Sequence, residues 1–203
     1  MKKQFLTQMG LPLVAVIFLG SVTAQGLKAI AEAEPIWYNC LTREVFTPEK
    51  QAWCDRWKIL QNGTYLVPSS LDLNPQYIKV TLKNGRYQQE DGKFFVELVN
   101  QKGWMTLGDL NNDGKKDAAV IFGVALDPNG KSVATYLTAM LDVDSKPRAL
   151  IPVRLGERII LNGPIMLNQA GAITVPFLTS KEVINRVYVM HEALKENILK
   201  QQP

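Results

Sequence analysis

Short apolar segments separated by turn signals make up most of the chain after residue 63. Ile78–Leu82 alternates apolar and polar residues, which is typical of a strand with one buried face. Asn84-Gly85 follows it directly and is a strong signal for a two-residue hairpin turn. Further apolar runs, divided by glycine- and proline-containing turns, occupy residues 94–99, 118–126, 132–143, 158–161 and 172–178. This pattern predicts an antiparallel sheet, rolled or sandwiched.

The segment before these strands has the spacing of a helix. Thr47 is a capping residue that precedes a proline and a glutamate, the residue types favoured in a first helical turn. The pattern predicts a helix from about Pro48 to Leu60, which Asn62-Gly63 would end. Trp53 and Trp57 would then share one face of the helix with the final leucine.

The C-terminal segment has two interpretations. In the first, Val187–Met190 is a strand that closes the sheet, and a short terminal helix runs from His191 to Lys200. In the second, Ser180 caps one longer helix that includes both segments. We favour the strand.

The first residues of the chain differ in composition from the rest. Two lysines precede the apolar run Leu11–Val22, and Val22-Thr23-Ala24 offers the small residues that a signal peptidase recognises. We expect a signal peptide over residues 1–24 and a single mature domain over residues 25–203. Cleavage after Ala33 is one alternative. The other is an uncleaved membrane anchor, although the run is shorter than the ~20 apolar residues that cross a bilayer.

The predicted mature chain carries little net charge. The formal charge of the whole chain is +4, and removal of the lysines at positions 2 and 3 lowers it to +2. Such a charge is too small to indicate nucleic acid or an anionic membrane as a partner. Gly, Pro or charged residues interrupt the later apolar runs, so we expect no membrane span after signal removal. The periplasm, the thylakoid lumen and the cell surface all fit.

The chain has two cysteines, Cys40 and Cys54, and both precede the predicted strands. Two thiols in an exported chain favour a disulfide. A zinc site is a poor alternative, because His191 is the single histidine. The sequence therefore predicts an α+β fold that is mainly β. It would contain an antiparallel sheet, a disulfide-bearing helical segment over residues 35–62 and a short C-terminal helix.

Aromatic residues gather around the two cysteines, at Trp37, Tyr38, Trp53 and Trp57. One interpretation is that the rings pack over the disulfide and cap one end of the core. The other is an aromatic platform for a sugar or a peptide. We favour packing, because no polar residues are arranged around the rings.

One segment has the pattern of a cation-binding loop. Positions one, three, five, seven and nine of residues 109–117 offer oxygen atoms, from the side chains of Asp109, Asn111, Asp113 and Asp117 and the carbonyl of Lys115. Gly114 at position six permits the tight turn that such a loop needs. Calcium prefers several hard oxygen ligands in a flexible shell. The spacing therefore predicts a structural calcium site.

This segment resembles the D-x-[DN]-x-D-G-x-x-D loops of dockerins and of integrin-type FG-GAP repeats. It departs from an EF-hand, because Val120 stands where the bidentate glutamate would be and because the flanks are predicted strands. The export signal, the tryptophan-rich cysteine pair and the single loop together resemble small exported cyanobacterial proteins. That resemblance implies no activity. The alternative is an Asn/Asp-rich turn whose side chains cap their own backbone and whose acids Lys115 and Lys116 partly neutralise without a metal.

The sequence contains none of the G-x-S-x-G, H-E-x-x-H or P-loop patterns. We therefore expect a non-catalytic exported protein with a calcium-stabilised β domain that acts through a protein or an envelope component. Without the bidentate glutamate, calcium affinity should be weak, on the order of 10⁻⁴–10⁻³ M. The alternative is a small glycan-directed hydrolase whose carboxylate pair is invisible in the sequence.

Overall fold

A computed structural model describes residues 37–70, 75–126, 132–178, 182–191 and 198–201. The chain divides into two units, residues 1–33 and 34–203, and all described residues belong to the second unit. The predicted signal peptide and both predicted cleavage points lie outside the described residues. The described part of the chain contains no helix with the length and hydropathy that a bilayer crossing needs.

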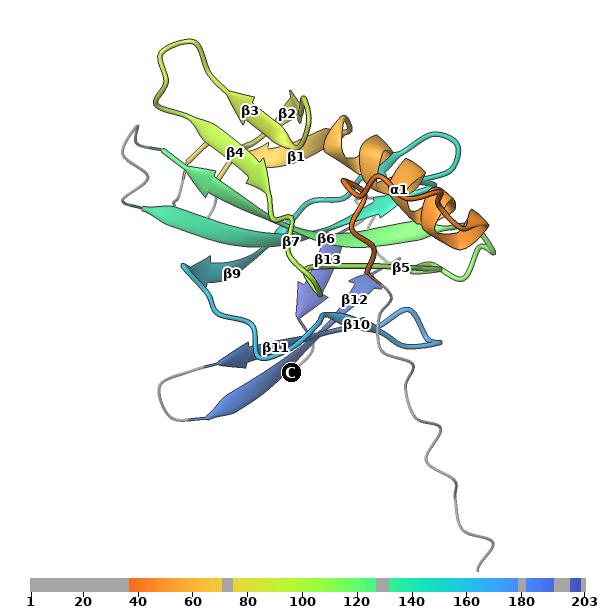
Figure 1. The fold of residues 1–203 in the computed structure, drawn as a ribbon. Helices are drawn as coiled ribbons and strands as arrows, with labels where there is room; N and C mark the ends of the chain where they lie inside the picture. Colours follow the sequence, from red (N-terminus) through yellow and green to blue (C-terminus); the bar gives the residue numbers. More distant parts are fainter. Residues whose placement is uncertain (1–36, 71–74, 127–131, 179–181, 192–197, 202–203) are drawn as a thin grey trace, which may run out of the picture. The chain divides into compact units, whose positions relative to one another are not determined.

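The described residues form one helix near the N-terminal side and many short strands (Figure 1). In chain order they are α1 (Pro48–Gln61), β1 (Thr64–Pro68), β2 (Tyr77–Thr81), β3 (Arg86–Gln88), β4 (Phe95–Leu98), β5 (Met105–Gly108), β6 (Asp117–Ala125), β7 (Val133–Leu141), β8 (Arg148–Ala149), β9 (Val153–Glu157), β10 (Met166–Leu167), β11 (Ile173–Leu178), β12 (Val183–His191) and β13 (Ile198–Gln201). The predicted fold class, mainly β with antiparallel sheets, is confirmed.

A curled, half-barrel sheet of seven strands organises the fold, in the order β3-β4-β6-β7-β8 with β5 and β9 paired beside this path. Its centre is the antiparallel pair β6–β7, which runs in unbroken register from Ala118 opposite Met140 to Ala125 opposite Val133. β4 and β5 both pair with β6, and β8 and β9 both pair with β7. A second sheet has the order β10-β11-β12-β13, and β1 pairs with β2 alone.

The two faces of the β6–β7 pair contribute to separate hydrophobic clusters. Ala118, Val120 and Phe122 of β6 belong to a cluster with α1 and the β1–β2 pair. Ala119 and Ile121 belong to a cluster with β11, β12 and the residues around β9. Because both faces of β6 are buried, its sequence is apolar at nearly every position and does not alternate.

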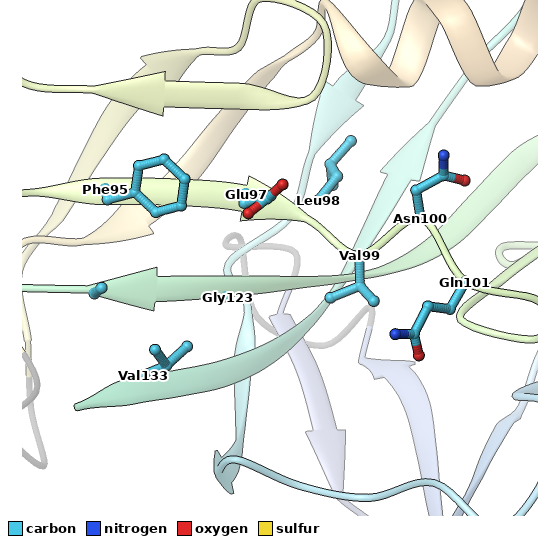
Figure 2. A pocket seen from close by; sticks show the side chains of 9 residues that line it. Phe95, Glu97, Leu98, Val99, Asn100, Gln101, Gly123 and Val133 are labelled. Atoms are coloured by element: carbon cyan, nitrogen blue, oxygen red, sulfur yellow. The ribbon is translucent and has the colours of Figure 1, made fainter. Parts of the chain in front are cut away.

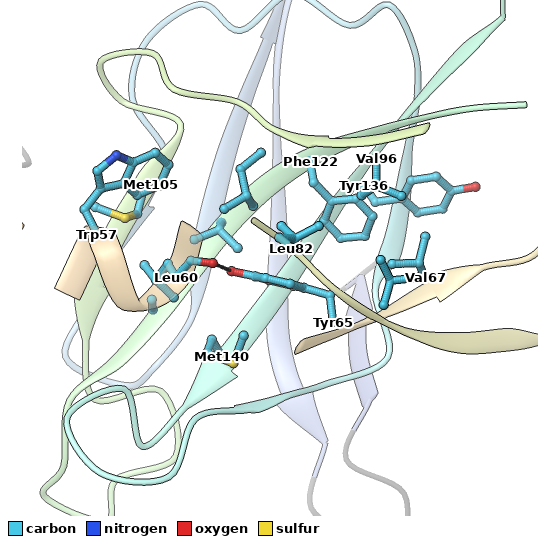
Figure 3. Packing of buried hydrophobic residues seen from close by; sticks show 14 of the residues in the cluster. Trp57, Leu60, Tyr65, Val67, Leu82, Val96, Met105, Phe122, Tyr136 and Met140 are labelled. Atoms are coloured by element: carbon cyan, nitrogen blue, oxygen red, sulfur yellow. Dashed lines mark hydrogen bonds between the residues drawn. The ribbon is translucent and has the colours of Figure 1, made fainter. Parts of the chain in front are cut away.

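Aromatic rings occupy the middle of the first cluster (Figure 3). The rings of Phe122 and Tyr136 stack with their centroids 5.6 Å apart. The fully buried Tyr65 donates its hydroxyl hydrogen to the carbonyl oxygen of Leu60 at 2.8 Å. This bond ties the end of α1 to β1, and burial raises the pKa of the Tyr65 hydroxyl far above its ordinary value.

The predicted helix is confirmed as α1, one residue longer than expected at its C-terminal end. The side-chain oxygen of Thr47 accepts a hydrogen bond from the backbone N–H of Lys50, as the capping pattern predicts. At the other end, the N–H of Asn62 bonds to the carbonyl oxygen of Ile59 and the N–H of Gly63 bonds to that of Leu60, each at 3.2 Å. Trp53, Trp57 and Leu60 are buried in the first cluster.

The predicted disulfide is also confirmed: Cys40 and Cys54 are bonded, with their Cα atoms 5.7 Å apart. The bond joins the segment before α1 to the buried face of the helix. The ring of Trp53 meets the edges of Trp37 and Tyr38 at centroid distances of 6.4 and 6.1 Å, and it stacks on Trp57 at 6.2 Å. Both helical tryptophans are buried, so the packing interpretation is confirmed.

Lys50 is a buried charge that the sequence pattern did not indicate. Its ammonium group bonds to the Thr42 hydroxyl at 2.6 Å and to the Glu44 carboxylate, and it lies 4.3 Å from the centre of the Phe46 ring. The hydrogen bond from Lys50 lowers the pKa of Glu44. These contacts hold the segment that enters α1 against the helix.

Two strand predictions need correction. The Asn84-Gly85 turn forms, with φ of 52° and 83°, but the strands beside it then separate, and β2 pairs with β1 whereas β3 pairs with β4. The predicted strand over Arg158–Leu161 is wrong, because the strand lies earlier, at β9. Arg158 has φ of 45°, a left-handed value that ends β9 where the chain turns away from β7.

At the C-terminal end, the strand interpretation of Val187–Met190 is confirmed within β12, and the longer helix is wrong. The short helix predicted over His191–Lys200 is also wrong for the residues of this range that the structure describes. His191 lies in β12 and residues 198–200 lie in β13, while residues 192–197 are outside the described ranges. Antiparallel pairing with β12 gives one edge of β13 its hydrogen-bond partners, and this outweighs local helix propensity.

Reduction of the disulfide should lower the free energy of unfolding by about 3 kcal/mol, because the bond closes a loop of about 15 residues in the unfolded chain. Denaturant unfolding with and without a reductant measures this effect. The Cys40→Ser/Cys54→Ser variant is the control and should show the lower stability in both conditions. Equal stability of the oxidised and reduced wild type would contradict the prediction.

Candidate metal site at the acidic loop

The acidic loop, residues 109–117, connects β5 to β6 and closes a hairpin in which Gly108 is opposite Asp117. Asn112 and Gly114 have left-handed backbone conformations, with φ of 58° and 81°. The space beside Gly114 is open, since a Cβ placed there meets no atom within 4 Å. Glycine is therefore favoured at this position by its backbone conformation and not by crowding.

Three of the predicted ligands form one hydrogen-bonded network. The two carboxylate oxygens of Asp109 accept the backbone N–H groups of Asp113, at 3.1 Å, and of Gly114, at 2.8 Å. The amide oxygen of Asn111 also accepts the N–H of Asp113, at 3.2 Å. Asp113 in turn accepts the N–H of Lys115 at 2.9 Å, and this bond is the main cause of its lowered pKa. The side chains thus turn inward onto the backbone of their own loop.

Asp117, the fourth predicted ligand, is fully buried. Its carboxylate accepts two backbone N–H groups, those of Leu110 and Asp142, each at 2.9 Å. Burial is the main cause of the raised pKa of Asp117, and the negative charges of Asp113 and Asp109 add to the rise. Asp117 therefore joins the acidic loop to a turn that is 25 residues later in the chain.

Lys115 places a positive charge beside the acids. Its ammonium group is 2.8 Å from a carboxylate oxygen of Asp142 and 3.8 Å from one of Asp113. The hydrogen bond to Asp142 is the main cause of the raised pKa of Lys115. The structure thus supports the alternative interpretation, in which the side chains of the loop cap their own backbone and a lysine partly neutralises the acids.

The turn after β7, residues 142–145, belongs to the site but was missed in the sequence. Asp142 has φ of 56°, and a hollow of about 300 Å³ separates this turn from residues 114–116. Asp144 accepts two hydrogen bonds from the guanidinium group of Arg56 in α1, at 2.7 and 2.8 Å. The acids of this turn are visible in the sequence, but their distance from the loop along the chain hides the contact.

The base of the acidic loop is packed tightly. Leu110 is buried in the second cluster, and Gly171 in the turn before β11 lies against its carbonyl group. A Cβ at Gly171 would stand 2.4 Å from that carbonyl oxygen. At Gly108, a Cβ would stand 2.3 Å from a methyl carbon of Leu167. The polar side chains of the loop are therefore carried on a backbone that the core holds in place.

No family model, curated protein sequence or solved structure matches this chain. The functional interpretation therefore rests on the residues themselves. In the described ranges, no three His, Cys, Asp or Glu side chains stand together in the arrangement of a metal site. The oxygen atoms of the acidic loop have the chemistry that calcium prefers, but they are turned toward backbone N–H groups.

Asp117→Ala should lower the free energy of unfolding by about 2–4 kcal/mol in calcium-free buffer, because two backbone N–H groups lose their acceptor inside the protein. Asp109→Ala is the matched control. It should cost less, since the N–H groups that it frees are exposed and can bond to water. Denaturant unfolding in EDTA measures both effects. Equal losses would show that Asp117 is not the anchor of the loop.

The Arg56–Asp144 ion pair should stabilise the protein at neutral pH and lose its effect in acid. Arg56 lowers the pKa of Asp144 in the folded state, so the contribution is present above the unfolded pKa and disappears as pH falls through the folded pKa. Half of the Asp144 side chain is exposed, and solvent screening limits the effect of Asp144→Ala to about 0.5–1 kcal/mol.

Unfolding of the wild type and of Asp144→Ala at pH 7 and near pH 3 tests this pH dependence. Arg56→Ala is the control, and the double variant should lose no more stability than either single variant. A loss of the same size at both pH values would contradict the assigned ion pair.

Proposed function

We propose that this chain is an exported, non-catalytic protein whose β domain is stabilised by calcium at the acidic loop. It would act through contacts with another protein or with a component of the cell envelope. The observation that carries the proposal is that Asp109, Asn111 and Asp113 share one hydrogen-bonded network on a short loop that ends at the buried carboxylate of Asp117. Four side chains with oxygen donors thus lie on one loop, and the base of that loop is packed against the core.

The hydrogen bonds of the loop do not prevent coordination. A carboxylate oxygen has two lone pairs, so an oxygen that accepts one N–H retains a second position for a cation. The N–H bonds to Asp109 and Asp113 also fix the path of the backbone between them. Calcium would need modest rotation of these side chains, together with the carbonyl of Lys115, to complete its oxygen shell.

Calcium would compete with the ammonium group of Lys115. That group is the nearest positive charge to Asp113 and is also paired with Asp142. Binding of a divalent cation would move Lys115 away from Asp113 through charge repulsion, and the side chain is exposed enough to move. Competition with an internal cation favours weak binding, on the order of 10⁻⁴–10⁻³ M, as expected for an extracellular structural site.

Two features of the chain support export. The Cys40–Cys54 disulfide is of the kind that persists in an oxidising compartment. The N-terminal residues 1–24 have the charged, apolar and small-residue order of a signal peptide. We therefore place the mature protein in a periplasm, a thylakoid lumen or at a cell surface, where calcium in the millimolar range would occupy a weak site.

Calcium should raise the stability of the wild type by RT ln(1 + [Ca²⁺]/Kd), which is about 1.4 kcal/mol when calcium is tenfold above Kd. Asp113→Ala should gain much less, because it loses one ligand. Melting curves in EDTA and in calcium measure both. Asp91→Ala, an exposed acid in the turn between β3 and β4, is the control and should respond like the wild type. A wild-type midpoint that does not move with calcium would make the loop an ordinary turn.

A further inference from the structure

One part of the seven-stranded sheet forms a groove of about 470 Å³, on the face that elsewhere packs against the second sheet (Figure 2). The strand register builds it from three rows of residues. Phe95, Ala125 and Val133 stand opposite one another on β4, β6 and β7. In the second row, Glu97 of β4 is opposite Gly123 of β6. In the third row is Val99, whose N–H bonds to the carbonyl of Ile121 in β6. Most of these residues are half-buried, so the groove is open to solvent.

Gly123 makes the floor of the groove. It is the one position of β6 in the middle row that faces this side, and a Cβ there would stand 3.2 Å from a methyl carbon of Val133. Its missing side chain leaves an open stretch of backbone bordered by Phe95, Val99 and Val133. An open floor beside an aromatic ring and two valine side chains gives a ring-shaped ligand room to lie against the sheet.

The charge in the groove is already balanced. Arg86 of β3 engages one carboxylate oxygen of Glu97 through two nitrogens, at 2.6 and 2.7 Å. Glu97 is the one acid among the described residues that line the groove, and it keeps a second oxygen that can accept hydrogen bonds. The described residues that line the groove therefore offer a charged ligand no excess of opposite charge, so charge complementarity favours a neutral ligand.

The rim of the groove is polar but uncharged. Asn100 and Gln101, directly after β4, are both exposed and line the end of the groove beyond Val99. Each side-chain amide offers an oxygen that accepts and a nitrogen that donates hydrogen bonds. Hydroxyl groups also donate and accept, and a set of them along one edge of a ligand would match this rim.

We propose that this groove binds a neutral saccharide. One ring of the saccharide lies on Phe95 and the floor at Gly123, beside Glu97, and the hydroxyl groups of a second ring bond to Asn100 and Gln101. Residues 95–100 span roughly 17 Å of extended chain, so a single ring is too short to make all these contacts. The proposal goes beyond the proposed function, because it names the chemistry of an envelope component that the protein would recognise. The groove shares no residue with the acidic loop, so saccharide binding should be the same in EDTA and in calcium.

Titration of the ¹⁵N-labelled protein with cellobiose, maltose and chitobiose tests the proposal. At least one disaccharide should cause saturable amide shifts at residues 95–101 and 123–125, with affinity in the millimolar range, about 1 mM or weaker. Glucuronic acid and glucosamine, which are charged, should bind more weakly. Absence of saturable shifts with all three disaccharides overturns the proposal. So do shifts outside the groove, or stronger binding of a charged sugar.

Two variants separate binding from folding. Asn100→Ala/Gln101→Ala changes exposed side chains and should weaken the titrated disaccharide at least about fivefold, the effect of two lost hydrogen bonds. The matched control is Gln89→Ala/Gln169→Ala, which removes two exposed amides outside the groove and should bind like the wild type. Gly123→Ala should also weaken binding, because the added methyl group would occupy space in the groove that the ligand needs. Unchanged affinity in the Asn100/Gln101 variant overturns the proposal.

Discussion

The antiparallel pairing of β6 with β7 is the interaction on which the rest of the structure depends. These two strands are the centre of the seven-stranded sheet, and every other strand of that sheet pairs with one of them or with a neighbour. Their opposite faces contribute to two hydrophobic clusters, so α1 and the β1–β2 pair pack on one side and the β10–β13 sheet on the other. A strand buried on both faces must satisfy its backbone groups within the sheet, and β6 does so by pairing with β7 along one edge and with β4 and β5 along the other.

Both candidate sites lie on this pair of strands. The acidic loop enters β6 at Asp117, and the groove occupies Gly123 and Ala125 near the other end of the strand. Six residues of extended chain separate Asp117 from Gly123, which is roughly 20 Å. The loop uses charged groups held by backbone N–H bonds, whereas the groove combines the backbone at Gly123 with neutral amides. The two proposed sites would therefore suit different ligands, a cation and an uncharged molecule.

Asp117 shows how the core and the acidic loop depend on each other. Burial of a carboxylate costs free energy unless its oxygens accept hydrogen bonds, and this cost raises the pKa of Asp117. Two backbone N–H groups, those of Leu110 and Asp142, supply these hydrogen bonds. The same bonds hold the start of the loop to the turn after β7. That turn continues through Asp144 to Arg56, so the disulfide-bearing helix is linked to the loop by polar contacts as well as through the core. Calcium at the loop would thus stabilise elements that are distant in the sequence.

Sequence by itself determined the features that depend on neighbouring residues. The cap of α1, the Asn84-Gly85 turn and the inward Asp109–Asp113 network all use contacts within a few positions of the chain. The apolar run of β6 also predicted burial, although not on which faces. Only the tertiary structure decided that β2 and β3 separate, that residues 198–201 form a strand, and that Asp117 meets Asp142. It also decided that Gly123 forms the floor of a groove. These features depend on strand register, which is set by contacts between residues far apart in the chain and leaves no local pattern to read.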